Sequence, residues 1–189
     1  MNRQKMNTKE LIARTAMELF VEKGVTETRI RDIASAAGIA EGTMYRHYAS
    51  KDELAWELFS TNLEAFGLEL DRVQKEHSTP RAKLDAMIHH FCRAFDEDWV
   101  LFSYLLLSRH GHSKKVTPDM VNPVDVLRRT IADGMEGGDI PKGDPDVATS
   151  MVLGLILHVA DSRADGGIEQ SLLSLSETLS AASWRVLSG

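Results

Sequence analysis

The sequence predicts an all-α protein with an N-terminal three-helix helix-turn-helix domain and a C-terminal helical bundle. Three observations support this fold class. Apolar residues recur at helical spacing, glycines and prolines divide the chain into helix-sized segments, and no alternating run of strand length occurs. The chain has 189 residues, of which 43% are hydrophobic, so it can bury a substantial core.

The N-terminal part divides into three predicted helices. Residues 7–10 have the pattern of a capping box, and the first helix is expected to end at Gly24, since glycine tolerates the left-handed cap conformation. Thr28 is the expected N-cap of a short second helix. Gly38 stands where a tight turn needs a positive φ, and a third short helix follows over residues 41–47.

Each of six further predicted helices follows a capping residue, a proline suited to the first turn, or a pair of helix-breaking glycines. We expect residues 7–60 to form the helix-turn-helix domain and residues 61–189 to form the bundle. The six helices are expected over residues 51–74, 80–95, 99–108, 123–136, 145–161 and 168–187.

The charge is divided unevenly along the chain. The net charge of −6, taken whole, argues against a nucleic-acid binder, which usually has a basic surface. Residues 1–51, however, carry a net charge of +3, and residues 52–189 carry −9. This asymmetry predicts two tasks in one chain, with any nucleic acid bound at the N-terminal end.

Several functional classes are not expected. The single cysteine, Cys92, excludes an intramolecular disulfide and suits a buried, inert thiol. His110 and His112 lack a third ligand at recognisable spacing, so we expect no metal and no cofactor. No nucleophile–base motif, phosphate loop or dinucleotide fingerprint occurs, so we expect no catalytic residues and no enzyme. Without an apolar run of about 18 residues or a signal sequence, we expect a cytoplasmic protein that does not enter a membrane.

Residues 28–54 have the pattern of a helix-turn-helix. Ala34 is small enough for two helices to cross closely, while Ile33, Ile39 and Met44 are spaced to share a small core. The second helix then presents hydroxyl, guanidinium and imidazole groups outward. These groups suit phosphate oxygens and base edges, so the pattern predicts DNA binding.

Within this stretch a turn glycine, an aromatic residue and a lysine occur at characteristic spacing. The residues concerned are Thr28, Arg31, Ile33-Ala34, Ala37-Gly38, Gly42-Thr43-Met44-Tyr45, His47-Tyr48, Ser50-Lys51 and Leu54. With them, roughly residues 8–60 resemble the DNA-binding domain of the TetR/AcrR family of transcriptional regulators.

The resemblance implies that the first helix of the motif touches the DNA backbone and a base edge, that the second forms the recognition surface, and that Lys51 holds a phosphate. The implied DNA-binding residues are Thr28, Arg31, Gly42, Thr43, Tyr45, Arg46, His47 and Lys51. Two residues depart from the family pattern. Ala40 stands where the family often has a capping serine, and alanine there gives up about 1 kcal/mol of helix-cap stabilisation. Glu41 either accepts from a cytosine amine or lowers non-specific affinity.

The predicted helix over residues 145–161 is apolar on all sides, which indicates burial on more than one side. The core of its own chain can cover one face of this helix, and a second copy of the chain can cover the other. The apolar stripe on the last helix would belong to the same interface. A twofold homodimer would place two recognition helices about 34–36 Å apart on a palindromic double-stranded DNA operator. Candidates for the dimer interface are Met151, Leu155, Val159, Leu172, Leu175 and Leu179.

The resemblance further implies a small-molecule effector bound among the middle helices. Aromatic and apolar side chains with a few polar ones suit such a pocket, and each also suits an ordinary core. The pocket candidates are Met87, His90, Phe91, Phe95, Trp99, Phe102, Tyr104, Met120 and His158.

Taken together, these features predict a transcriptional regulator, specifically a repressor that a small-molecule effector releases from its operator. Two alternatives remain open: a DNA-binding regulator without such an effector, and a helical enzyme with an incidental helix-turn-helix. Two interpretations also remain for the basic residues near the N-terminus, a basic arm toward DNA or a solvated tail; these residues are Arg3, Lys5 and Lys9.

Overall fold

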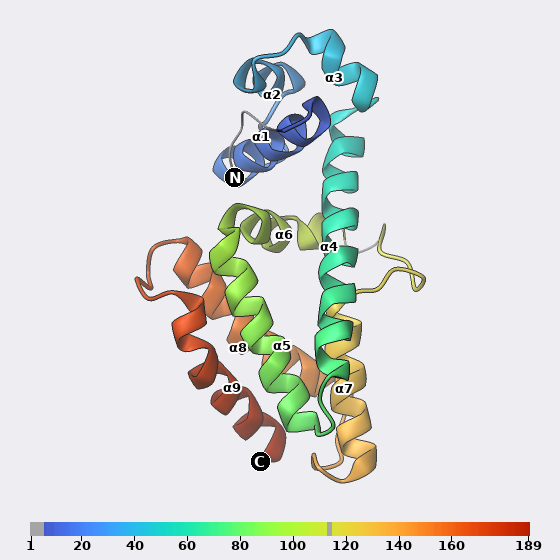
Figure 1. The fold of residues 1–189 in the computed structure, drawn as a ribbon, viewed down its shortest axis with the longest axis vertical. Coiled ribbons are helices and arrows are strands. Elements are labelled where there is room, and N and C mark those ends of the chain that lie inside the picture. Colours follow the sequence, from blue (N-terminus) through green and yellow to red (C-terminus); the bar gives the residue numbers. More distant parts are fainter. Residues whose placement is uncertain (1–5, 113–114) are drawn as a thin grey trace. The chain divides into compact units, whose positions relative to one another are not determined.

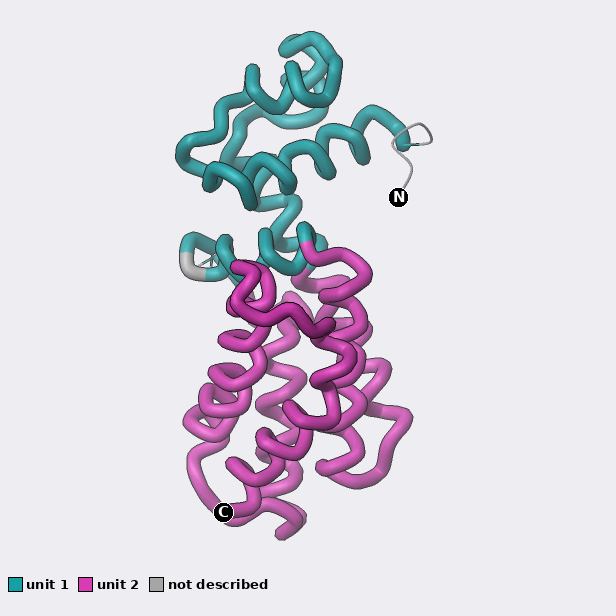
Figure 2. The backbone as a smooth tube through the Cα atoms, turned by 90° about the vertical axis from the view of Figure 1, so that its left-hand side faces the viewer, with its two compact units in different colours: residues 1–62, 100–116 teal, residues 63–99, 117–189 magenta. Residues whose placement is uncertain are grey.

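The computed structural model describes residues 6–112 and 115–189, and within them it contains nine α-helices and no strand (Figure 1). The predicted all-α fold class is therefore confirmed. The chain divides into two compact units, coloured separately in Figure 2. Unit 1 comprises residues 1–62 and 100–116, and unit 2 comprises residues 63–99 and 117–189.

Unit 1 begins with three short helices and is completed by parts of two others. Its elements are α1 (Thr8–Lys23), α2 (Ile30–Ala37), α3 (Glu41–His47), the first half of α4 (Lys51–Lys75) and nearly all of α6 (Trp99–His112). The predicted capping box of α1 is confirmed, because the Asn7 side chain accepts from the amide of Glu10 and the Glu10 carboxylate accepts from the amide of Asn7. Gly24 ends α1 with a φ of 83°.

The core of unit 1 joins α1 to α6, two segments far apart in the sequence. Phe20 and Tyr104 are buried and their rings stack, with centroids 5.7 Å apart. The Tyr104 hydroxyl donates to the carbonyl oxygen of Ala55 in α4 at 2.6 Å. These contacts explain why residues 100–116 belong to unit 1, a return of the chain for which the sequence carried no signal.

Unit 2 is a helical bundle in which α5 packs along α9, and α8 packs on both α7 and α9. Its helices are the second half of α4 with α5 (Pro80–Glu97), α7 (Pro123–Gly137), α8 (Pro145–Ala164) and α9 (Leu172–Ser188). Three boundaries differ from the prediction by three or four residues. Helix α6 continues past residue 108 to His112, α8 continues past residue 161 to Ala164, and α9 begins at Leu172 instead of residue 168, with Ser171 as its N-cap.

Helix α8 is the one candidate membrane span among the described residues, by length and composition, with a mean hydropathy of 1.2 over its apolar window. The sequence pattern of the same stretch, apolar on all sides, predicts a helix buried on more than one side. Length and composition do not separate a spanning helix from a core helix of a soluble protein.

Candidate nucleic-acid interface

Helices α2 and α3 form the predicted helix-turn-helix, joined by a turn at Gly38. Gly38 has φ 67° and ψ 32°, the left-handed conformation that glycine adopts without steric cost. Its amide and that of Ile39 donate back to carbonyl oxygens in the last turn of α2, which closes the helix end. Ile33 and Met44 are fully buried across the turn, as predicted, whereas Ile39 is only half-buried.

The side of α3 opposite this core is exposed. Glu41, Gly42, Arg46 and His47 are exposed, and Tyr45 is 57% exposed, which is high for an aromatic residue. Five of the predicted recognition residues thus belong to one short helix with an open surface; they are Gly42, Thr43, Tyr45, Arg46 and His47.

Two details of α3 bear on how it would meet DNA. The Arg46 guanidinium donates to the Thr43 hydroxyl at 2.9 Å, so an internal hydrogen bond orients its charge on the helix surface. A Cβ added at Gly42 would meet no atom within 4 Å, so packing within the chain does not require glycine there. Ala40, the N-cap, makes no side-chain capping bond, which agrees with the predicted weak start of α3.

The structure corrects the predicted role of Thr28. Its side chain is 0% exposed, and its hydroxyl donates to the carbonyl oxygens of Gly24 at 2.8 Å and Leu19 at 3.3 Å. Thr28 therefore ties α1 to the turn that follows, and its side chain does not face solvent. The N-cap of α2 is Arg29, one residue later than predicted.

Arg29 is an exposed cation that the sequence interpretation missed. It stands at the start of α2, and Arg31, a predicted contact residue, is also exposed, with its Nε 3.8 Å from an oxygen of Asp32. The signal that could have identified Arg29 is its charge in a basic N-terminal segment, directly before the predicted helix.

Lys51 also differs from the prediction. Its ammonium group donates to three backbone carbonyl oxygens of the turn between α1 and α2. In this structure the ammonium is therefore hydrogen-bonded within the chain and is not available to bind a phosphate. A sequence motif places the lysine, but the partner of a long side chain depends on the turn that folds beside it.

Lys9 belongs to the folded unit. Its Nζ lies 2.7 Å from an oxygen of Glu57 in α4 and 5.6 Å from the centroid of the buried Tyr48 ring. The hydrogen bond to Glu57 raises the pKa of Lys9, and burial raises the pKa of Tyr48. The other two residues of the suggested basic arm, Arg3 and Lys5, lie outside the described residues.

The histidines and the cysteine show no reactive arrangement in the described part of the chain, where no three His, Cys, Asp or Glu side chains gather as metal ligands would. His112 packs against the rings of Trp56 and Phe59, and burial lowers its pKa. The side chain of His110 lies outside the described residues. Burial raises the pKa of Cys92 to about 12, so the thiol stays protonated at neutral pH.

The nine pocket candidates divide between the two units. Phe102 and Tyr104 belong to unit 1, and Tyr104 is part of its core. The other seven belong to unit 2, where Trp99 and His158 are exposed. Within unit 2, α5 contributes three buried candidates, and Met120 is half-buried; the three are Met87, Phe91 and Phe95.

His90 is the polar candidate nearest to this apolar set. It is half-buried on α5, and its ring stacks on Phe66 with centroids 5.8 Å apart. Burial lowers the pKa of His90, and the neighbouring Arg93, whose Nη2 lies 3.1 Å from the His90 Nδ1, lowers it further. The imidazole is therefore biased toward its neutral form.

The candidates for the dimer interface separate into two groups. Leu172 and Leu179 are 0% and 6% exposed, because α9 turns this stripe inward within unit 2, so the structure removes them from the predicted interface. Met151 is 55% exposed, and Leu155, Val159 and Leu175 are half-buried. Three further apolar residues of α8 and α9 keep accessible surface: Val147, Leu173 and Val186.

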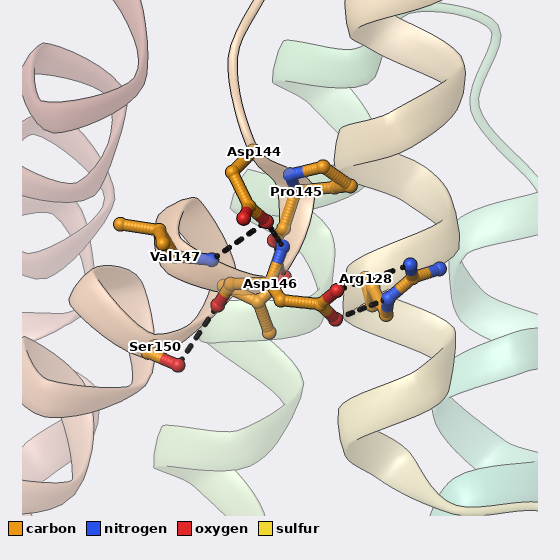
Figure 3. A network of polar contacts seen from close by, with 7 residues as sticks. Arg128, Asp144, Pro145, Asp146, Val147 and Ser150 are labelled. Atoms are coloured by element: carbon orange, nitrogen blue, oxygen red, sulfur yellow. Dashed lines mark hydrogen bonds and ion pairs between the residues drawn. The ribbon is translucent and has the colours of Figure 1, made fainter.

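A shallow apolar cavity of about 300 Å³ lies beside these residues in unit 2, lined in part by Val147, Met151 and Val186. Figure 3 shows how the adjoining first turn of α8 is fixed. The Asp144 carboxylate accepts from the amides of Asp146 and Val147, and the Asp146 carboxylate pairs with Arg128 of α7. The turn that presents Val147 is thereby held in place.

Comparisons with known proteins agree with this arrangement. A family model described as bacterial regulatory proteins, tetR family, matches residues 12–58, which span α1 to the first part of α4. The chain is 24% identical over 169 residues to the fatty acid metabolism regulator protein of Bacillus subtilis, covering 87% of each. It is 30% identical over 123 residues to the HTH-type transcriptional repressor KstR2 of Mycobacterium tuberculosis, covering 57% of this chain and 61% of that protein.

Solved structures share the fold over nearly the whole chain. The transcriptional regulator FadR from Bacillus subtilis, in complex with stearoyl-CoA, superposes with a TM-score of 0.81 at 23% identity, covering 95% of this chain and 98% of that one. The fatty acid degradation regulator FadR from Bacillus halodurans gives 0.81 at 20% identity, covering 97% and 96%.

Proposed function

Because the chain belongs to the TetR family of bacterial regulatory proteins, which are DNA-binding transcriptional regulators, we propose that it represses transcription from a palindromic operator and is released by a small-molecule effector. The observation that carries the proposal is the exposed side of α3, which presents Tyr45, Arg46 and His47 while Met44 and Tyr48 anchor the other side. Repression is supported by the relative that is itself named a transcriptional repressor.

The contacts proposed with DNA are of two kinds. The exposed side chains of α3 would read base edges, whereas Arg29 and Arg31 at the start of α2 would contact phosphates. Both helices lie in the segment with a net charge of +3, so attraction to the phosphate backbone would orient this face of the protein toward the DNA. Binding to operator DNA would place the protein in the cytoplasm.

A homodimer is proposed through the exposed apolar residues of α8 and α9 in unit 2. Met151 and Val147 give α8 an apolar side that its own chain leaves accessible, and Leu173 and Val186 do the same for α9. Contiguous exposed apolar surface on a soluble protein marks an interaction site. Twofold symmetry would give each half of a palindrome one copy of α3.

A long-chain acyl-CoA is the effector class we propose. The support is the name of the Bacillus subtilis relative and the stearoyl-CoA in the complex of the structural neighbour. Unit 2 offers apolar side chains suited to an acyl chain, including Phe91 and Phe95. The effector would act by binding more tightly to the state with low DNA affinity. Helix α4 contributes residues to both units and is one of the covalent connections through which that preference could pass.

Selection of bound DNA from a random pool tests the proposal. We expect an enriched sequence with two inverted half-sites about 10 base pairs apart. Titration of the complex with acyl-CoA thioesters of increasing chain length, followed by fluorescence anisotropy, should then release the DNA, whereas free CoA should not. Failure to enrich any sequence would contradict DNA recognition, a single unrepeated half-site would contradict the dimer, and retention at every chain length would contradict the effector class.

A further inference from the structure

Lys51 places a positive charge at the N-terminus of α4, where the helix dipole disfavours it. The structure supplies the compensating acceptors. The Lys51 Nζ donates to the carbonyl oxygens of Val25 at 2.6 Å, Thr26 at 3.0 Å and Thr28 at 2.8 Å. An ammonium group has three donors, so these bonds use all of them. A phosphate could be bound only after one of them breaks.

The three acceptors belong to the turn over residues 24–29, between α1 and α2. The carbonyl of Gly24 accepts from Thr28, and that of Arg29 accepts from the first turn of α2. Lys51 serves three of the four carbonyls between these two. Backbone carbonyls that are partly shielded from water need a donor, and the ammonium supplies one to Val25 and to Thr28 on the part-buried side of the turn.

The last of these bonds fixes the peptide group that leads into the DNA-facing surface. The carbonyl of Thr28 and the amide of Arg29 belong to one peptide group, which is planar and rigid. Lys51 holds its oxygen at 2.8 Å, and the Asp32 carboxylate accepts from its N–H at 3.0 Å. The exposed Arg29 side chain therefore leaves from a backbone that is held on both sides.

We propose that Lys51 is a positioning residue of the DNA interface, which orients Arg29 by clamping the turn over residues 24–29 instead of binding a phosphate itself. The inference rests on the proposed function as a DNA-binding regulator. It assigns the lysine a role through a neighbouring cation, so the two residues should be coupled in their effect on operator affinity.

The salt dependence of operator binding separates the two roles of Lys51. In Lys51→Met the stem is kept and the ammonium removed. We expect operator affinity to fall about tenfold, because Arg29 would meet its phosphate in a poorer geometry. The slope of log affinity against log salt should stay within about 0.3 of wild type, because Arg29 keeps its charge at the DNA and no phosphate-binding cation is removed. Arg31→Met on α2 is the matched control, because losing a direct phosphate contact should reduce the steepness of this slope by about 0.9.

Two further measurements keep the test decisive if Lys51→Met does not fold. Lys51→Arg keeps the charge and binds phosphate well, but a planar guanidinium cannot reproduce three bonds converging on one atom. It should lose affinity if Lys51 clamps the turn and keep it if Lys51 holds phosphate. A double-mutant cycle of Lys51→Arg with Arg29→Met should show overlapping losses, whereas independent contacts would multiply.

The outcomes separate failure of the proposed function from failure of the Lys51 clamp alone. Wild-type protein that binds no selected DNA contradicts the proposed function. If the wild-type protein binds the selected DNA, any one of three results overturns the clamp alone. These are full affinity in both Lys51 variants, a salt slope reduced by about 0.9 in Lys51→Met, and strictly multiplicative losses in the double-mutant cycle.

Discussion

A glycine inside α4 shows at the scale of one residue how a missing side chain lets two segments touch. Gly67 lies in the part of α4 that belongs to unit 2, beside the segment that leads into α7. A Cβ at this position would lie 2.1 Å from the carbonyl oxygen of Val121 and 2.8 Å from its carbonyl carbon. Both are backbone atoms, so relief would require the chain itself to move.

Replacing Gly67 by alanine should destabilise unit 2 although alanine is the better helix former. The helix propensity gained is about 1 kcal/mol, but forced overpacking costs about 1–3 kcal/mol and more where backbone must shift. We expect a lower urea midpoint for Gly67→Ala. Gly137→Ala is the control, because its Cβ would meet only the Asp139 carboxylate at 3.6 Å. Equal midpoints for the two variants would contradict the close approach.

Single residues of the interface were predictable where helix periodicity decides the outcome. Tyr45, Arg46 and His47 lie on the exposed side of α3 as expected, because Met44 marks the buried side. Thr28 and Lys51 were not, since their roles depend on hydrogen bonds to carbonyls that only the folded turn brings together. Local sequence patterns do not indicate hydrogen bonds between a side chain and backbone groups that are distant in the sequence.

At the scale of one element, α9 begins where a distant carboxylate meets it. Asp96 at the end of α5 accepts from the amides of Leu172 at 3.1 Å and Leu173 at 2.8 Å. Asp96 is the first of three consecutive acidic residues, 96–98, directly before α6, and from the sequence alone such a cluster is read as the charged start of that helix. A cap 76 positions away in the sequence leaves no local pattern. Helix interiors were predicted well from periodicity, whereas this boundary combines the local Ser171 cap with the tertiary contact to Asp96.

Removing the Asp96 carboxylate should loosen the start of α9. Loss of a helix cap costs about 0.5–2 kcal/mol, so Asp96→Ala should lower the thermal midpoint and speed hydrogen exchange in the first turn of α9. Asp96→Asn keeps only one of the two acceptor oxygens and should retain part of the protection. The exposed neighbour Glu97→Ala serves as the control. Asp96→Ala behaving like Glu97→Ala would rule out the capping role.

At the scale of the whole molecule, the uneven charge and the open apolar side of unit 2 are the features that amino-acid patterns indicated best. The predicted dimer stripe on α9 was placed on the wrong side at Leu172 and Leu179, because an apolar stripe at helical spacing shows that one side is buried but not by what. The α5 helix of the same chain covers it. Met151 on α8 remains the most exposed of the predicted interface residues.

A carboxylate at Met151 should therefore separate the proposed dimer. Each buried, unpaired Asp would cost about 2 kcal/mol, and twofold symmetry introduces it twice, so the dimer dissociation constant should rise about 1000-fold. Sedimentation velocity of Met151→Asp should show a monomer, with operator affinity lost because a monomer can engage only one half-site. Leu68→Asp is the matched control, since Leu68 on α4 is 53% exposed against 55% for Met151. A dimer that survives Met151→Asp but not Leu68→Asp would move the interface from α8 to α4.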